Sequence, residues 1–172
     1  MKAASVPVDL EVIFRAQYPR IARVIARVIS DPARAEELAV EVFLKLWRSP
    51  EVQNQKPEAW LYRVAVRSGI DELRRQARRT RYESFLKLIP AAPTPEEIHS
   101  TNEEQQRVRT VLATIDVRQA ELLMLRSHGL SYEELAAALE IKLSSVGTLL
   151  SRAQQAFRKN FVRRFGDEHG TD

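Results

Sequence analysis

The stretch SYEELAAALEIKLSSVGTLLSRAQQAFRK, residues 131–159, decides the fold of this 172-residue chain. Ser131 and Glu134 stand at its start with the spacing of a capping box, in which each side chain accepts a hydrogen bond from the backbone N–H of the other residue. The apolar face that follows runs to Leu139, and a short turn leads to a second helix from Ser144. Two helices joined by so short a turn predict a helix-turn-helix.

The second of these helices has an apolar face and a polar face. On the polar face, short side chains come first and cations follow toward the C-terminus. Early residues of a recognition helix reach base edges in the major groove, while later cations hold phosphates. An ordinary amphipathic helix, whose dipole favours cations at its C-terminus, is the alternative. The candidate duplex-binding residues are Ser144, Ser145, Gly147, Thr148, Ser151, Arg152, Gln155, Arg158 and Lys159.

A helix predicted from Pro57 to about Arg79 has a second basic face. Its apolar side chains fall in one half, together with Gly69, which permits close approach of a neighbouring helix. Trp60 and five arginines occupy the other half, where we expect solvent. Guanidinium groups bind phosphates and an indole ring stacks on unpaired bases, a combination suited to single-stranded DNA. A solvated arginine face with Trp60 packed under a loop is the alternative. The five arginines are Arg63, Arg67, Arg74, Arg75 and Arg78.

The helix predicted for residues 32–48 has a wider apolar surface than a helix needs to pack on one side against a core. Two rows of apolar side chains, one of them ending at Trp47, form an ordinary core face. Val40 and Leu44 add a third row, which widens the apolar arc well beyond the stripe of about 100° typical of a surface helix. The helix either packs in the middle of its own small bundle or exposes a docking strip, bordered by acidic residues, to a partner protein.

The remaining segments follow the helical period, so we predict an all-α fold of two small domains joined by a linker. A first helix is expected over residues 9–30, with Pro19 ending or kinking it early. Residues 88–106 contain three of the eight Pro, four acidic residues and no Lys or Arg, which is typical of a linker, although a helix could begin at Thr94. The predicted units are a helical domain (1–87), the linker (88–106), the helix-turn-helix domain (107–165) and an acidic tail (166–172).

Composition excludes several classes of function. Without Cys, the chain has no disulfide, no Cys-ligated zinc and no thiol nucleophile. Its three His are scattered, and its five Gly form no phosphate-binding loop. We therefore expect no metal site, no cofactor, no catalytic residue and no enzymatic activity. No apolar stretch is long enough to span a membrane and the start lacks a secretory pattern, so we expect a cytoplasmic protein without membrane insertion.

The net charge of +4 hides two basic blocks. Residues 60–89 carry eight Lys and Arg against three acidic residues, and residues 141–165 carry six cations and no acid. Both blocks coincide with the faces predicted to bind nucleic acid, which is the distribution expected of a protein with two DNA-facing surfaces.

Three segments, within about residues 8 to 165, resemble a known family. Residues 35–47, AEELAVEVFLKLW, resemble the AEDLVQEVFLRLW segment of bacterial RNA polymerase sigma factors of the extracytoplasmic-function (ECF) group, in the sigma-70 family. That resemblance implies that this helix docks on the clamp of the polymerase's largest subunit, and that the protein also contacts the flap. The implied polymerase-binding residues are Glu36, Glu37, Val40, Glu41, Leu44 and Lys45.

The other two segments resemble the family's promoter-binding elements. Residues 60–75, WLYRVAVRSGIDELRR, are similar to WLYRIARNLAIDELRR, which implies contact with the −10 element and with the melted strand and adds Asp71 to the candidate residues. Residues 131–156 resemble the helix-turn-helix that binds the −35 element as duplex DNA. Departures from the family pattern occur at Arg67, in place of a frequent Asn, at Gly147–Leu149, in place of Lys-Ser-Arg, and at Glu140, in place of a turn Gly.

The main hypothesis is therefore a sigma factor that binds core RNA polymerase and directs promoter recognition, strand opening and transcription initiation. The resemblance further implies control by a separate anti-sigma protein. The alternative is a free-standing dimeric helix-turn-helix regulator whose N-terminal half binds a ligand or forms the dimer. An enzyme with a DNA-binding tail does not fit, because no acid, base or nucleophile constellation is present.

Overall fold

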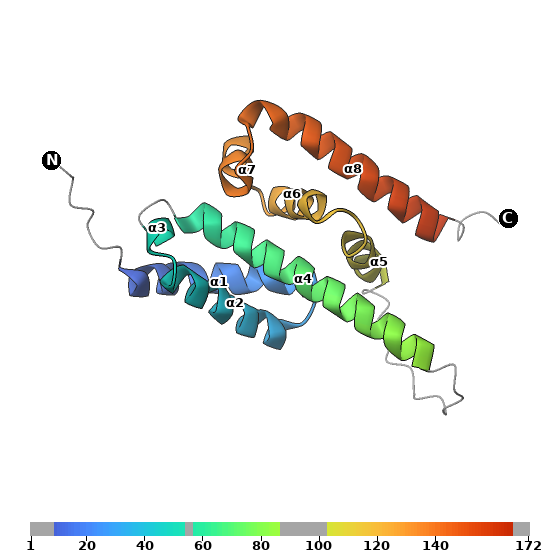
Figure 1. Cartoon of the computed structure of the whole chain (residues 1–172), viewed down its shortest axis with the longest axis horizontal. Helices are drawn as coiled ribbons and strands as arrows, with labels where there is room; N and C mark the ends of the chain where they lie inside the picture. The colour runs from blue at the N-terminus through green and yellow to red at the C-terminus, as the bar shows by residue number, and fades with distance from the viewer. Residues whose placement is uncertain (1–8, 54–56, 87–102, 167–172) are drawn as a thin grey trace.

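A computed structural model describes residues 9–53, 57–86 and 103–166, and these residues form helices and turns without a strand (Figure 1). The all-α prediction is therefore confirmed for this part of the chain. The helices are α1 (Leu10–Ile29), α2 (Pro32–Trp47), α3 (Pro50–Gln53), α4 (Pro57–Leu86), α5 (Glu103–Leu112), α6 (Val117–Ser127), α7 (Tyr132–Leu139) and α8 (Leu143–Phe165).

Helices α1, α2 and α4 pack together as the N-terminal group. Asp9 caps the start of α1, where its side chain accepts hydrogen bonds from two backbone N–H groups of the first turn. Ser30 follows the last residue of α1 in the left-handed conformation, at φ 62°. Pro19 lies inside α1, which continues to Ile29, so of the two predicted effects, an early end or a kink, the early end is wrong. The side chain of Asp31 then caps α2, which has Pro32 in its first turn.

Gly69 sets the distance between α4 and α1. A Cβ atom built at Gly69 would lie 2.9 Å from Cβ and from Cγ1 of Val28, closer than real side chains approach. Both residues are buried. The predicted close approach at this glycine is confirmed, and it brings α4 deep into the N-terminal core.

The helix α4 continues to Leu86, seven residues beyond the predicted end near Arg79. No Pro or Gly interrupts the sequence between Gly69 and Leu86, and nothing else there stops a helix. Its last turns extend beyond the N-terminal helices (Figure 1).

The C-terminal group contains the predicted helix-turn-helix. Asp116 caps α6, and Gly129 follows that helix with φ 88°, a conformation that favours glycine. The capping box of Ser131 and Glu134 is present at the start of α7. Glu140 ends α7 in the left-handed conformation, at φ 54°, and α8 begins at Leu143, one residue before the predicted start.

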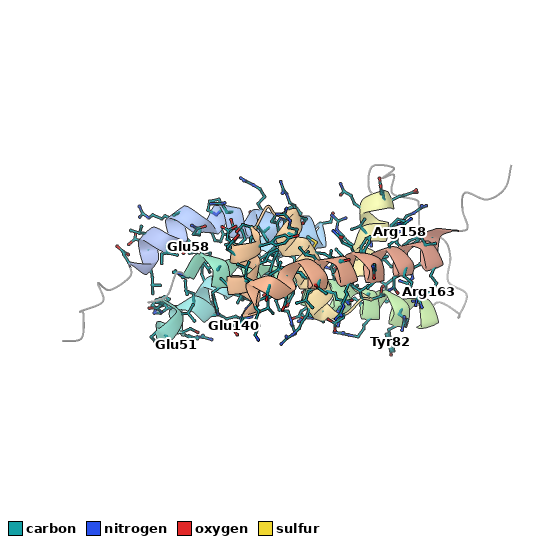
Figure 2. The ribbon with its side chains drawn as sticks, turned by 90° about the horizontal axis from the view of Figure 1, so that it is seen from above. Glu51, Glu58, Tyr82, Glu140, Arg158 and Arg163 are labelled. Carbon is teal, nitrogen blue, oxygen red and sulfur yellow. The ribbon has the colours of Figure 1, made fainter. Side chains whose placement is uncertain are left out.

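The two groups of helices lie against each other. The helix α4 is placed between α1 and α2 on one side and α5, α6 and α7 on the other, while α8 forms the outer edge of the molecule (Figures 1 and 2). A predicted helix start at Thr94 lies outside the described residues, and so do most of the predicted linker and the acidic tail.

Candidate nucleic-acid interface

The apolar strip of α2 is exposed. Val40 and Leu44 have 43% and 41% of their surface exposed, whereas the side chains of the neighbouring core rows are buried. Trp47 was expected at the end of a core row but is 69% exposed, at the last residue of α2. Acidic and basic side chains border the strip. The residues predicted to bind a partner are all exposed: Glu36, Glu37, Val40, Glu41, Leu44 and Lys45.

Arg34 ties α2 to α4 beside this strip. Its guanidinium lies 2.7 Å from the carboxylate of Glu37 and 3.3 Å from that of Glu72, which is buried in α4. The hydrogen bond with Glu37 is the main reason why the pKa of Arg34 is raised, with Glu72 contributing and burial opposing. Arg75 also approaches Glu72, at 3.4 Å. Of the predicted DNA-binding arginines, Arg75 therefore already has an acidic partner within its own helix.

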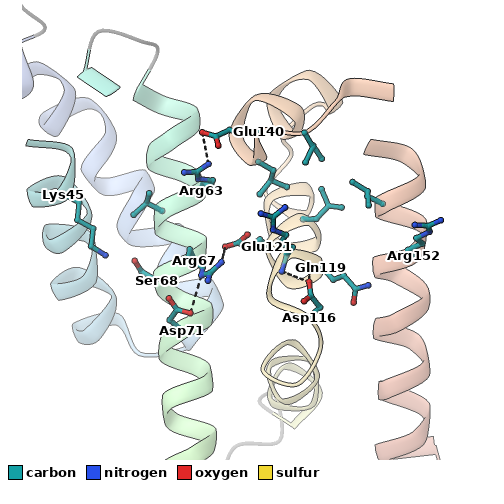
Figure 3. Close-up of a pocket in the computed structure, with 16 residues that line it drawn as sticks. Lys45, Arg63, Arg67, Ser68, Asp71, Asp116, Gln119, Glu121, Glu140 and Arg152 are labelled. Carbon is teal, nitrogen blue, oxygen red and sulfur yellow. Dashed lines mark hydrogen bonds and ion pairs between the residues drawn. The ribbon is translucent and has the colours of Figure 1, made fainter. Parts of the chain in front are cut away.

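Three of the predicted DNA-binding arginines of α4 contact the C-terminal group, and Figure 3 shows two of them, Arg63 and Arg67. Nη1 of Arg67 lies 2.8 Å from Oε1 of Glu121 in α6. Nη1 of Arg63 donates to the carbonyl oxygen of Ala138 at 3.2 Å and lies 3.3 Å from Oε1 of Glu140. Nη2 of Arg74 donates to the carbonyl oxygen of Ile115. The expectation that this face is solvated is wrong for Arg63 and Arg74, which are half-buried because α6, α7 and their flanking turns pack against α4. Arg67 is exposed as expected, although one of its nitrogens contacts Glu121.

The pair of Arg67 and Glu121 joins an accessible cation to a buried acid. The side chain of Arg67 is 48% exposed and that of Glu121 only 7%. The hydrogen bond with Glu121 is the main cause of a raised pKa at Arg67, opposed by burial and aided by Asp71. Asp71 lies 3.5 Å from Nε of Arg67, so this predicted DNA-binding residue orients an arginine in the closed molecule (Figure 3).

Grooves flank these contacts on both sides. A groove of about 650 Å³ runs beside Arg67 and is lined by charged residues of α4 and α6 and by apolar residues such as Leu122 and Leu149. A second groove, of about 890 Å³, lies beside Arg63 and includes Trp60, which is half-buried. Trp60 thus lies at the junction of the two groups and not fully on the solvent side, as was expected.

The basic face of α4 continues beyond Arg79, where the helix was predicted to end. Arg78 is exposed as predicted, and so are Arg79, Arg81 and Tyr82, of which Tyr82 is 65% exposed. An exposed aromatic ring among arginines repeats the combination of ring and guanidinium groups at Trp60, which suits unpaired bases and phosphates. The uninterrupted helical sequence after Arg79 was the signal that could have identified them.

The polar face of α8 is open. All the residues predicted to contact duplex DNA on this helix are exposed except Ser145, which is half-buried. Among the residues that the structure describes, Arg152, Arg158 and Lys159 have no ion-pair partner. Arg152 lines the same groove as Arg67 and Glu121, and its side chain is exposed (Figure 3). The cations of α8 are therefore free to bind an anion, unlike Arg63 and Arg67.

Among the residues that the structure describes, no group of three His, Asp or Glu side chains is arranged to hold a metal ion. No described helix has the length and apolar character needed to cross a membrane.

Comparison with known proteins gives two family matches, one in the N-terminal group of helices and one in the C-terminal group. The Sigma-70 region 2 family model matches residues 13–79, and the Sigma-70 region 4 model matches residues 105–156. The ECF RNA polymerase sigma factor SigE of Mycolicibacterium smegmatis is 30% identical over 85% of this chain, which spans 59% of the length of that protein. The ferric citrate uptake sigma factor FecI of Escherichia coli is 29% identical over 75% of this chain and 77% of its own length.

Solved structures share the fold. CnrH, in complex with the cytosolic domain of CnrY, superposes with a TM-score of 0.55 and 16% identity, over 87% of this chain and 85% of that chain. The sigma factor RpoE of Bartonella quintana, in complex with the anti-sigma factor NepR, gives a TM-score of 0.52 and 19% identity, over 88% and 96%. With both family models matched in order and ECF sigma factors among the relatives, the chain belongs to the sigma-70 family of RNA polymerase sigma factors, in its ECF group.

Proposed function

We propose that the chain joins core RNA polymerase and directs promoter recognition, strand opening and transcription initiation. The observation that carries this proposal is the exposed strip of Val40 and Leu44 on α2, bordered by Glu37, Glu41 and Lys45. Apolar side chains ringed by charges are typical of a specific protein interface, because the apolar centre is desolvated while the rim selects the partner. In this proposal the strip binds the clamp of the largest polymerase subunit.

The helix α8 reads the −35 element as duplex DNA. Its first turns present Ser144, Gly147 and Thr148, which are small enough to let the backbone approach base edges. Arg152, Arg158 and Lys159 lie further along the same exposed face and hold phosphates. The docking of the C-terminal domain on the polymerase flap fixes the distance between α8 and α4.

The helix α4 acts on the −10 element and on the melted strand. Trp60 supplies a stacking surface for an unpaired base, while Arg63, Arg67, Arg74, Arg75 and Arg78 neutralise phosphates, with Asp71 orienting Arg67. In this proposal residues 1–87 bind the polymerase and the −10 element, and residues 107–165 bind the −35 element. The protein contributes no catalytic group, works in the cytoplasm and is held inactive by an anti-sigma partner.

In vitro transcription with purified bacterial core polymerase tests the proposal. We expect start-specific transcripts only when the chain is added. Leu44→Asp should abolish both core binding and transcription, since it places a charge in the centre of the docking strip. Val162→Asp is the matched control, because Val162 is a similarly exposed apolar residue on α8, at 56%, outside the proposed strip.

Two results would reject this function. One is equal core binding by the Leu44→Asp and Val162→Asp variants. The other is tight binding of the chain alone to a palindromic duplex with half-sites about one helical turn apart, which is the behaviour of a dimeric helix-turn-helix regulator.

A further inference from the structure

We propose that the chain closes on itself through an interdomain latch that withholds α4 from promoter DNA until the two helical groups separate. The latch consists of Arg63, Arg67 and Arg74 of α4 with their acceptors on the C-terminal group: the carboxylates of Glu121 and Glu140 and the carbonyl oxygens of Ile115 and Ala138. This inference rests on the proposed role of α4, and it concerns the regulation of that same surface.

The acceptors of the latch are the kind of groups that DNA would offer. A guanidinium binds a carboxylate and a phosphate with the same fork of N–H donors, and carbonyl oxygens accept from the same donors. Arg67 cannot keep its 2.8 Å contact with the buried Glu121 and also approach a phosphate from that side, because α6 occupies the space. Promoter DNA and the C-terminal group therefore compete for the same arginines.

The closed form masks one DNA-binding surface and leaves the other open. The helices α6 and α7 pack against the part of α4 that carries Arg63 and Arg67, whereas the polar face of α8 is exposed and its cations have no ion pair among the described residues. A closed chain can thus make weak contact with duplex DNA through α8 while α4 remains withheld. Melted DNA should bind well only to the open form.

The latch is built to open reversibly. Its ion pairs are partly exposed, with 48% of the side chain of Arg67 and 79% of that of Glu140 accessible, and grooves of about 650 and 890 Å³ flank them. Salt screens such pairs, since the Debye length falls to about 3 Å at 1 M ionic strength. The 16 residues that join Leu86 to Glu103 can span up to about 55 Å when fully extended, so separation requires no break in either group.

Fluorescence energy transfer can test the opening directly. The chain contains no Cys, so an Ala16→Cys, Gln154→Cys background gives two unique label sites on exposed positions of α1 and α8. In this background we expect transfer efficiency to fall as NaCl rises and to fall at low salt in the Glu121→Gln, Glu140→Gln variant. Glu133→Gln is the matched control, because Glu133 is an exposed carboxylate on α7 without an ion pair to α4.

Binding to a single-stranded oligo(dT) probe supplies the functional arm. The Glu121→Gln, Glu140→Gln variant, without the added Cys residues and labels, should bind the probe at least about threefold tighter than the wild-type chain at low salt. Only molecules in the open form bind the probe well, so their fraction limits the apparent affinity. Circular dichroism must show unchanged helicity. The salt titration of the wild-type labelled chain needs no substitution in the latch and covers the case in which the double variant misfolds.

The outcomes separate the latch from the proposed function. Transfer efficiency that responds neither to salt nor to Glu121→Gln, Glu140→Gln would overturn the latch even if transcription assays succeed. An opened variant with wild-type affinity for the probe would also overturn it, since α4 would not have been masked. Opening with tighter binding supports the latch even if core polymerase ignores the chain, in which case the proposed function alone fails.

Discussion

At the scale of single residues, Gly69 determines how closely α4 packs on α1. Gly69→Ala should lower the free energy of unfolding by about 1–3 kcal/mol, since the added Cβ would lie 2.9 Å from two atoms of buried Val28. The helix propensity of Ala, about 1 kcal/mol better than that of Gly, offsets only part of this loss. Urea denaturation followed by circular dichroism measures the difference.

Gly147→Ala is the matched control for that substitution. Gly147 also lies inside a helix, but a Cβ atom there would meet only Cε2 of Tyr132, at 3.8 Å, an ordinary contact. Propensity should therefore dominate, and stability should rise by up to about 1 kcal/mol. Equal effects of the two substitutions would contradict the packing argument.

His128 should make the stability of the protein sensitive to mildly acidic pH. Burial, and secondarily the charge of Arg27, lowers the pKa of His128 below its usual 6.5, and its Nε2 atom is buried without a hydrogen-bond partner among the described residues. Below pH 6.5 the unfolded chain takes up a proton at this site before the folded chain does. The free energy of unfolding should therefore fall as pH drops below 6.5.

Comparison with His128→Gln isolates this effect. The free energy of unfolding of both proteins is measured between about pH 7.5 and pH 5.5, near the usual pKa of histidine. His99 and His169 are present in both, so their titration cancels in the difference. The wild-type chain should lose stability relative to the variant as pH falls. A difference that stays constant with pH would refute the assignment.

At the scale of helices, α7 depends on its cap because it is only eight residues long. The backbone N–H of Glu134 donates to Oγ of Ser131 at 3.1 Å, and the backbone N–H of Ser131 donates to the carboxylate of Glu134 at 2.7 Å. Ser131→Ala should cost about 1 kcal/mol of stability. Glu134→Gln retains an acceptor and should cost less than half as much in the same denaturation assay. The reverse order would contradict the capping argument.

Local signals predicted most of the helices. The capping box at Ser131 and Glu134 and the close approach at Gly69 are readable from short stretches of sequence, and the structure confirms both. Errors occurred where a local signal was overridden or absent. At Pro19 the local signal was overridden, because packing against α2 and α4 keeps α1 continuous. At Trp47 a local signal was absent, because the exposure of this side chain depends on where α2 ends.

At the scale of the whole molecule, helical periodicity could not predict the closed arrangement. The distribution of apolar and polar side chains along α4 shows which of them lie outside the core of the N-terminal group. This distribution is the same whether the polar face contacts water, DNA or another domain. The acceptors of Arg63 and Arg67 lie more than fifty residues away in sequence. The candidate residues of α8 are exposed as predicted, except half-buried Ser145, and those of α2 follow the exposed one of the two alternatives that the sequence left open.

Arg109 is a second link between the two groups, so its loss should change how the whole molecule unfolds. From α5, its Nε atom donates to the carbonyl oxygen of Val28 at 3.1 Å, and Nη2 donates to that of Arg27 at 3.4 Å. These carbonyls belong to the last turn of α1, where backbone acceptors lack partners within the helix and a cation is favoured. Burial lowers the pKa of Arg109, and Nη2 also donates to Oε1 of Gln105, one turn earlier in α5, at 3.4 Å.

Arg109→Leu should therefore uncouple the C-terminal group from α1. The substitution keeps apolar bulk but leaves buried carbonyls unpaired, at a cost of about 1–3 kcal/mol. Calorimetry should show one cooperative transition for the wild-type chain and two separate transitions for the variant, as expected when a shared interface is lost. Arg118→Leu, at an exposed position on α6, should behave like the wild-type chain. If Arg109→Leu also unfolds in a single transition with an unchanged midpoint, then the link through α1 does not hold the two groups together.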